Sequence, residues 1–367
     1  MHSNNPPKLY YLIKVNAVLC ALYFGFRAAV LLDYCTDAPA AAIAAVFVVC
    51  ALAGFYLSVN IWSRKGLLFM SFMLMLAVTD IICLVIAGLF GGFENRPFMI
   101  LWLGGVFGIT AFDLFVFYGF YNERRVVKNT LTVTSPKLHE QCRLAVLSDL
   151  HFGTIQPDKV LTDTIQKINS EKYDGVILTG DIVDEHTSKE GMKILFTELS
   201  KLESTYGTFF VHGNHDRQEC IKGDRTFTDS EFDTLMKEAG IRNIDDTVVN
   251  LGDSIQLIGR KDYSFDDRMD VSALLAGSDP SKFRIVAEHQ PSECEELSEQ
   301  GVDVCLSAHY HGAQNWPNNL IYRLAGLRFM GEYRIGGMIL YVNSGLAGSK
   351  HRIRTHGHCE YLELKLG

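Results

Sequence analysis

The chain has 367 residues, 48% of them hydrophobic, and a formal net charge of −8 at pH 7. Its length accommodates two or three domains. The acidic balance argues against a nucleic-acid partner, because phosphate backbones are bound by basic surfaces. The nine cysteines form no CxxC pair, which excludes a zinc ribbon or a thioredoxin motif. Their scatter is typical of free thiols in a reducing compartment.

Apolar residues concentrate in the first third of the chain. Four segments there have about the 20 residues that a membrane-crossing helix needs. They are Leu9–Leu32, Ala40–Trp62, Leu67–Phe90 and Phe98–Tyr121, and short polar connectors separate them. This pattern predicts a four-helix transmembrane bundle over residues 1–121.

The basic residues predict the orientation of these spans. Lys8 precedes the first span, Arg64 and Lys65 lie between the second and third, and Arg124 and Arg125 follow the fourth. Because basic residues favour the cytoplasmic side, we expect a multi-pass protein of a bacterial-type inner membrane with a cytoplasmic C-terminal domain. Residues 122–140 are predicted to form a juxtamembrane linker to that domain.

Asp80 and Asp113 lie near the middle of the third and fourth apolar segments, and Arg27 lies in the outer half of the first. Charges in lipid are costly and suggest a polar pocket or an ion path, which would make the bundle a transporter or channel. The alternative is that Arg27 pairs with one of the aspartates. The second interpretation is favoured, because no further ionisable groups form a relay.

Residues 141–367 have an ordinary globular composition, and short apolar runs alternate there with helical patterns. Predicted strands are Arg143–Leu147, Gly175–Thr179, Thr208–His212, Ser254–Gly259, Phe283–Ala287, Val302–Leu306, Met338–Val342 and Glu360–Leu364. Predicted helices are Pro157–Lys172, Ser188–Lys201, Asp229–Ala239 and Ser292–Glu299. The alternation indicates an α/β domain whose central sheets are covered by helices.

Polar motifs follow several of these strands. They are Asp149-Leu150-His151, Gly180-Asp181, Gly213-Asn214-His215-Asp216, Glu288-His289 and His309-Tyr310-His311. In α/β sheets, ligands collect beyond the carboxyl ends of the strands, so these groups are expected to converge. Mixed carboxylate, amide and imidazole ligands suit a pair of divalent metals, and such a pair clamps a phosphoryl group during displacement.

The ordered motifs D-x-H, G-D-x-x, G-N-H-D, a lone His and H-x-H resemble those of the calcineurin-like metallophosphoesterase superfamily. Ser148–Gly153, Thr179–Asp184 and Leu340–Gly345 are similar to segments of its membrane-anchored YkuE-like branch. The resemblance covers nearly all of residues 142–367. It implies a two-sheet αββα sandwich and two divalent metal ions, with Mn, Fe, Zn and Mg all open.

The resemblance also implies roles for the site residues. One metal would be held by Asp149, His151, Asp181 and His311, and the second by Asp181, Asn214, His289 and His309. Asp181 would bridge the two ions. His215 would donate a hydrogen bond or proton at the phosphoryl group, and Asp216 would orient His215.

Two parts of the chain depart from the family pattern. Ala308 replaces the usual glycine before the final histidine pair, which removes no ligand. Lys350–His358 replaces a proline-containing segment, and its Arg352 and Arg354 either contact the substrate phosphate or lie on a solvated loop. The apolar segment Asn315–Met330 is either a membrane-facing lip that admits a lipid chain or ordinary packing under a long loop.

These features together predict a membrane-anchored dimetal phosphoesterase. We expect it to hydrolyse a phosphoester or pyrophosphate bond in a lipid-linked or membrane-associated substrate, by metal-activated hydroxide. The branch that the chain resembles includes enzymes that act on UDP-diacylglucosamine, which makes a lipid-linked nucleotide one concrete option. A soluble phosphodiester or phosphomonoester is the first alternative, and a non-enzymatic membrane scaffold or sensor is the second.

Overall fold

The computed structural model describes residues 7–58, 64–153, 155, 158–219 and 224–367. These residues divide into two compact units. The helical unit contains residues up to Gly119 together with Trp316–Leu327. The sheet unit contains Phe120–Asn315 and Arg328–Gly367. The division falls inside one helix, α5, whose last turn belongs to the sheet unit.

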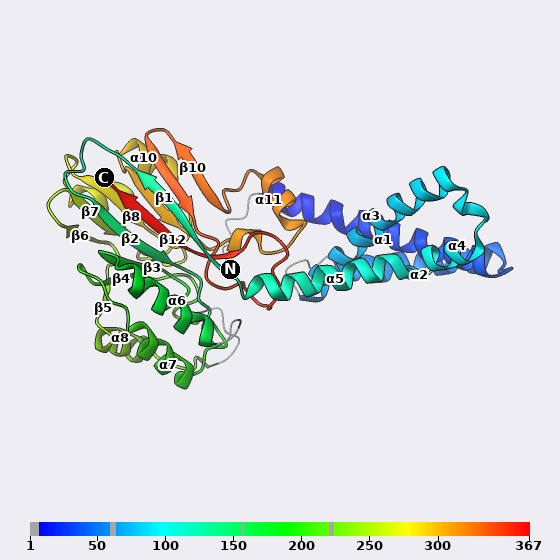
Figure 1. Cartoon of the computed structure of the whole chain (residues 1–367), viewed down its shortest axis with the longest axis horizontal. Coiled ribbons are helices and arrows are strands. Elements are labelled where there is room, and N and C mark those ends of the chain that lie inside the picture. Colours follow the sequence, from blue (N-terminus) through cyan, green and yellow to red (C-terminus); the bar gives the residue numbers. More distant parts are fainter. Residues whose placement is uncertain (1–6, 59–63, 154, 156–157, 220–223) are drawn as a thin grey trace. The chain divides into compact units, whose positions relative to one another are not determined.

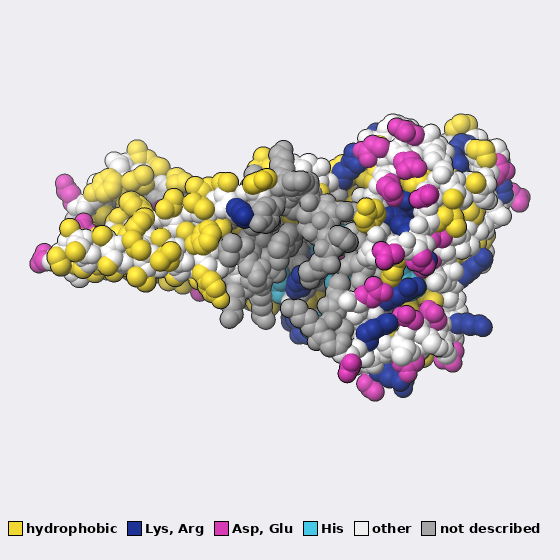
Figure 2. All heavy atoms as spheres, turned by 180° about the vertical axis from the view of Figure 1, so that it is seen from behind, with side chains coloured by type: hydrophobic (Ala, Val, Ile, Leu, Met, Phe, Trp, Pro, Cys, Tyr) yellow, Lys and Arg dark blue, Asp and Glu magenta, His cyan; other side chains and the backbone are white. Residues whose placement is uncertain are grey.

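Apolar helices make up most of the helical unit. The helices α1 (Pro7–Cys35), α2 (Ala40–Ser58) and α3 (Arg64–Phe90) are long and apolar enough to cross a membrane. The fourth predicted span is broken instead into α4 (Arg96–Leu103) and α5 (Val106–Glu123), which are bent by 47°. The break lies at Gly104–Gly105, where the φ of Gly105 is 79°. Hydrophobic side chains cover most of the visible surface of the helical unit (Figure 2). Trp62, the predicted end of the second span, lies outside the described residues.

The charged residues of the first and third helices pair with each other. Arg27 Nη1 lies 3.0 Å from Asp80 Oδ1, and Arg27 Nη2 donates to the Trp102 carbonyl at 3.1 Å. The Trp102 indole donates to the same Asp80 oxygen at 2.9 Å, and Tyr23 donates to the other. The Trp102 carbonyl belongs to the broken end of α4. The pairing interpretation therefore accounts for Arg27 and Asp80 better than an ion path does.

Two six-stranded sheets form the centre of the sheet unit (Figure 1). The first has the order β1-β12-β2-β3-β4-β5, and the second has the order β10-β11-β9-β8-β7-β6. The bounds in the first are β1 Val126–Val133, β12 Cys359–Leu366, β2 Cys142–Leu147, β3 Gly175–Thr179, β4 Thr208–Val211 and β5 Ile241–Asn243. In the second they are β10 Gly331–Ile335, β11 Met338–Val342, β9 Val304–Ser307, β8 Phe283–Ala287, β7 Ile255–Gly259 and β6 Thr247–Leu251.

Alternate residues of each strand enter different apolar layers, as the two-residue period of a strand requires. Leu144 and Val146 of β2 face the core between the two sheets, where they join Ile285 of β8. Ala145 and Leu147 face the helices on the other side of the first sheet. Strands buried on both faces explain the continuous apolar runs in the sequence. The result is the αββα sandwich expected from the sequence.

Helices cover the outer face of each sheet. The first sheet is covered by α6 (Asp158–Glu171), α7 (Lys189–Leu199) and α8 (Asp229–Glu238). The second is covered by α9 (Val271–Ala276) and α10 (Cys294–Glu299). Side-chain caps define where two of them begin, since Ser188 accepts from Gly191 N and Thr228 forms a capping box with Glu231.

The expected linker differs from the structure. Residues 126–133 form β1, which pairs in parallel with β12 along its whole length. Its sequence, VVKNTLTV, alternates too weakly in polarity to stand out as a strand. Long-range pairing with the C-terminal strand, rather than local pattern, places it in the sheet.

Candidate metal centre

The polar motifs lie in loops that leave the carboxyl ends of the strands, and backbone hydrogen bonds join these loops to one another. Asp149 N donates to the Gly180 carbonyl at 3.0 Å, and His151 N donates to the Asp181 carbonyl at 3.1 Å. The loop after β8 is joined to the loop after β9, because Ala308 N donates to the His289 carbonyl at 2.8 Å. Parallel neighbours in each sheet thus bring distant residues to one rim.

Five of the seven predicted metal ligands adopt a left-handed backbone conformation. Their φ angles are positive, between 40° and 76°, at Asp149, His151, Asp181, His309 and His311. Such angles are uncommon for residues with a Cβ atom and persist only where the surrounding structure enforces them. This concentration marks the rim as a functional site.

Two glycines permit the close approach of the loops. A Cβ on Gly180, whose φ is 83°, would lie 2.6 Å from Gly213 N and 2.9 Å from His289 Nδ1. A Cβ on Gly213 would collide with the Asp181 carboxylate. These glycines are therefore required by the packing of the loops.

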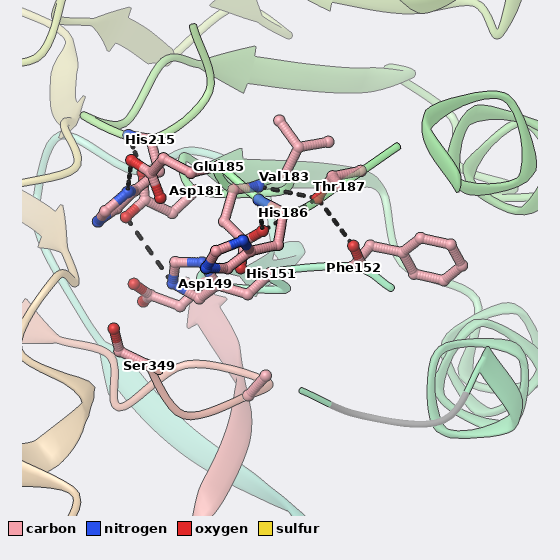
Figure 3. A network of polar contacts seen from close by, with 12 residues as sticks. Asp149, His151, Phe152, Asp181, Val183, Glu185, His186, Thr187, His215 and Ser349 are labelled. Carbon is pink, nitrogen blue, oxygen red and sulfur yellow. Dashed lines mark hydrogen bonds and ion pairs between the residues drawn. The ribbon is translucent and has the colours of Figure 1, made fainter. Parts of the chain in front are cut away.

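The side chains form two adjacent groups with the chemistry of metal ligands. Asp149, His151 and His311 make the first group, and Asp181, His289 and His309 make the second. Within each group the ligand atoms lie within 4.8 Å of one another. Asp181 faces both groups, since its Oδ2 lies 3.0 Å from His289 Nε2 and 3.9 Å from His151 Nε2. Figure 3 shows Asp181 beside His151.

The polar atoms of these groups fit a pair of cations. Both carboxylate oxygens of Asp149, the Nε2 of His151, the Oδ2 of Asp181 and the Oδ1 of Asn214 are buried without a hydrogen-bond partner. Buried acceptors of this kind are costly unless something satisfies them. Two divalent cations would do so. Asn214 as a ligand and Asp181 as a bridge remain predictions.

Backbone carbonyls orient two of the histidines toward the centre. His289 Nδ1 lies 2.9 Å from the Thr179 carbonyl, and His311 Nδ1 lies 2.9 Å from the Ala347 carbonyl. Each contact favours a proton on Nδ1 and leaves Nε2 as the free electron-pair donor. Burial also lowers the pKa of His309 to about 3 and that of His151 to about 4, which keeps these rings neutral as metal binding requires.

His215 stands apart from the two groups and pairs with a residue that the sequence analysis missed. Its Nδ1 lies 2.6 Å from Glu185 Oε1, and Figure 3 shows the two side chains facing each other. Burial favours the neutral ring, but the carboxylates of Asp181 and Glu185 together raise the pKa of His215 to about 9. Glu185 lies four positions after Asp181, and this place shortly after the G-D motif is the sequence signal that could have identified it as a site residue.

Asp216 has a different role from the expected one. Its carboxylate accepts the backbone N–H groups of Asp181, Ile182 and Gly213 at 2.7–2.8 Å. It therefore braces the loops after β3 and β4, whereas Glu185 is the carboxylate that contacts the His215 ring. Sequence adjacency suggested Asp216, but the direction of its side chain decided otherwise.

Replacing Glu185 with Gln is expected to lower turnover on the order of tenfold. A hydrogen bond to a charged group is worth about 1.5 kcal/mol, and an energy of that size corresponds to about a tenfold change in rate. Because Glu185 raises the pKa of His215, its loss lowers that pKa. If protonated His215 is the active form, the alkaline limb of the pH–rate profile shifts to lower pH. The measurement is kcat against pH for both proteins. In a His215→Ala background the Glu185 change should have no effect, and a full effect there would contradict the pairing.

The two candidate substrate residues occupy different environments. Arg354 is fully buried, and its guanidinium donates to the carbonyls of His311 and Ala347 and to the Glu123 carboxylate. It is thus a buried structural residue behind His311, which fits neither of the two interpretations from the sequence, a substrate phosphate contact or a solvated loop. Arg352 is exposed, and its role in substrate binding remains a prediction.

Comparisons with known proteins agree with this geometry. The family model of the calcineurin-like phosphoesterases matches residues 142–313. An uncharacterized metallophosphoesterase of Helicobacter pylori strain J99 is 30% identical over 256 residues, which cover 67% of this chain and 66% of the relative. The match therefore spans slightly less than two thirds of that relative's length.

Two further relatives are more distant. UDP-2,3-diacylglucosamine pyrophosphatase LpxG of Chlamydia trachomatis is 27% identical, and the match covers 58% of this chain and 79% of the relative. The uncharacterized metallophosphoesterase YkuE of Bacillus subtilis is 25% identical, with 69% of this chain and 91% of the relative covered. Both matches support the resemblance that the motifs indicated.

Proposed function

We propose that this chain, which belongs to the calcineurin-like metallophosphoesterase superfamily, hydrolyses a phosphoester or pyrophosphate bond in a membrane-associated substrate. Its domain is a metal-dependent phosphoesterase domain with two Asp/His groups. The observation that carries the proposal is the position of Asp181 beside both groups. Bound divalent ions would supply charge neutralisation of the phosphoryl group and acidification of a water molecule.

The residues of this chain would divide the remaining work. Asp149, His151 and His311 would hold one ion, and Asn214, His289 and His309 would hold the other. Asp181 would contribute to both ions. In the hydrolysis a water oxygen forms a new bond to phosphorus and the bond to the leaving oxygen breaks. His215 would give its Nε2 proton to that leaving oxygen, while Glu185 stabilises the imidazolium form beforehand.

Two observations support a lipid-linked substrate. Three N-terminal helices, or four if the bent pair is one span, are apolar enough to cross a membrane. LpxG, whose name assigns it a lipid-linked nucleotide, is among the relatives. We propose that the sheet unit lies on the cytoplasmic side, which is the side predicted by the basic residues. A soluble phosphodiester or phosphomonoester is the alternative substrate.

A matched pair of substrates tests the lipid assignment. UDP-2,3-diacylglucosamine and UDP-N-acetylglucosamine share the same pyrophosphate bond, but only the first carries two long acyl chains on the sugar. With full-length protein in detergent and Mn²⁺, we expect kcat/KM to be at least on the order of 100-fold higher for the lipid, since burying four methylene groups is worth about 3 kcal/mol. Equal values, or turnover of bis-p-nitrophenyl phosphate alone, would favour the soluble alternative.

A further inference from the structure

The segment Trp316–Leu327 belongs to the helical unit, although it lies between strands of the sheet unit in the sequence. Its helix α11 (Asn318–Ala325) contacts α1. Trp316 anchors the start of the segment, because its carbonyl accepts from Ser71 Oγ at 3.3 Å and its ring lies 6.1 Å from the ring of Phe115. Helices α1, α3 and α5 thus all take part in holding this segment.

These contacts lie near one end of the helical unit. Ser71 is seven residues after Arg64, the first residue of α3, and Phe115 is eight residues before Glu123, the last residue of α5. At 1.5 Å per residue, Trp316 therefore lies about 10–12 Å along the axis from these helix ends. This is the end at which the basic residues of the sequence gather. Tryptophan is enriched at that depth, where an apolar ring meets lipid headgroups.

The two faces of α11 differ in their surroundings. Asn318, Ile321 and Tyr322 are buried in the protein. Leu320 and Leu324 share the opposite face and are 46% and 60% exposed. Arg323 is exposed beside Leu324, and a long basic side chain in that position reaches from an apolar layer to headgroups.

We propose that α11 is an interfacial membrane helix whose Leu320 and Leu324 enter the acyl region of the bilayer. The occupant of this apolar face is lipid, because α11 contacts α1, a helix apolar enough to cross a membrane whose exposed side chains include Val15, Val18 and Leu19. An amphipathic helix held at the boundary buries its apolar face about 5–10 Å below the headgroups. The proposal depends on insertion of the N-terminal helices in a membrane and not on the identity of the substrate.

The chain links α11 to the candidate metal centre over a short stretch of sequence. Four residues, Gly312 to Asn315, connect His311 to Trp316. The loop that carries His309 and His311 is therefore tied through the chain to a helix in the lipid surface.

Lipid quenching tests the proposal directly. A fluorescent amino acid is placed at position 324 of the full-length protein, which is then reconstituted in nanodiscs of phosphatidylcholine with or without bromine on the acyl chains. Position 114 on α5, where Leu114 is 65% exposed, is the lipid-facing reference. Position 194 on α7, where Ile194 is 46% exposed, is the matched apolar control in the sheet unit.

We expect brominated lipid to lower the emission at position 324 by about the same fraction as at position 114, and to leave position 194 unchanged. Iodide in the buffer should quench only position 194. Quenching of position 324 by iodide rather than by brominated lipid would overturn the proposal. Quenching of position 324 by neither agent would also overturn it and would indicate a protein partner on this face. A label at position 320 repeats the measurement if the first variant does not fold.

Discussion

Replacing Asp181 with Asn is expected to lower kcat by at least on the order of 1,000-fold and to reduce the bound metal below two equivalents. The physical reason is the loss of negative charge at a carboxylate that faces both groups of ligands. Asp181 Oδ2 lies 3.0 Å from His289 Nε2 and 3.9 Å from His151 Nε2. Lewis-acid stabilisation by bound cations is worth several kcal/mol, and each 1.4 kcal/mol is tenfold in rate.

Asparagine isolates this effect because it is isosteric with aspartate. Asp181 Oδ1 accepts the backbone N–H of His215 at 2.9 Å, and an amide oxygen can keep that bond. Metal content by mass spectrometry and far-UV circular dichroism are the measurements. Asp303→Asn is the control, because Asp303 is paired with Lys137 just before β9, whereas the ligands follow the strands. An Asp181→Asn protein with two equivalents of metal and full turnover would disprove the shared role.

Replacement of Glu123 is expected to have the second largest effect on the metal centre, although Glu123 is not among the predicted metal ligands. It is 1% exposed, accepts the backbone N–H of Gly348 at 2.6 Å, and accepts from Arg354 Nε at 3.2 Å. Arg354 in turn donates to the His311 carbonyl at 2.9 Å. The Ala347 carbonyl, next to Gly348, contacts both His311 Nδ1 and Arg354. The last residue of α5 therefore positions the backbone and the ring of His311.

Replacing Glu123 with Ala removes the carboxylate that pairs with the buried Arg354 guanidinium. Removing one partner of a buried ion pair costs about 3–5 kcal/mol. We expect the His311 group to lose metal affinity about 10–100-fold, the usual effect of removing a residue that orients a ligand. Metal titration of the purified protein should show one weakened equivalent and one unchanged. Glu123→Asp should recover part of the affinity, since it retains the charge.

A buried glutamate elsewhere provides the matched control. Glu363 is also 1% exposed and pairs with Arg143 and Lys128, which lie within strands β2 and β1, whereas the metal ligands lie in loops that follow strands. Glu363→Ala should lower the melting temperature and leave both metal affinities unchanged. Equal loss of both metals in Glu123→Ala, with the same loss in the control, would show that Glu123 acts through global stability alone.

The amino-acid pattern was sufficient to predict much of this protein. Hydropathy predicted α1 to α3, because a span of about 20 apolar residues is a local property. Strand ends bearing Asp, Asn and His predicted where the ligand loops lie, because the parallel topology brings carboxyl ends to one edge. The break in the fourth span depends on the local pair Gly104–Gly105, but hydropathy averages over such a pair. The strand β1 was missed because its place depends on pairing with β12, more than 200 residues away.

The sequence by itself therefore determined the class of chemistry, the order of the ligand-bearing loops and the presence of apolar helices. Only the tertiary structure decided which carboxylate contacts His215, because the direction of a side chain depends on the packing of its loop. Glu185 takes that position and Asp216 braces the backbone instead. Tertiary structure likewise buried Arg354 behind His311 and grouped Trp316–Leu327 with the apolar helices. The burial of Arg354 and the grouping of Trp316–Leu327 both depend on contacts between residues far apart in the chain, and a local sequence pattern cannot predict such contacts.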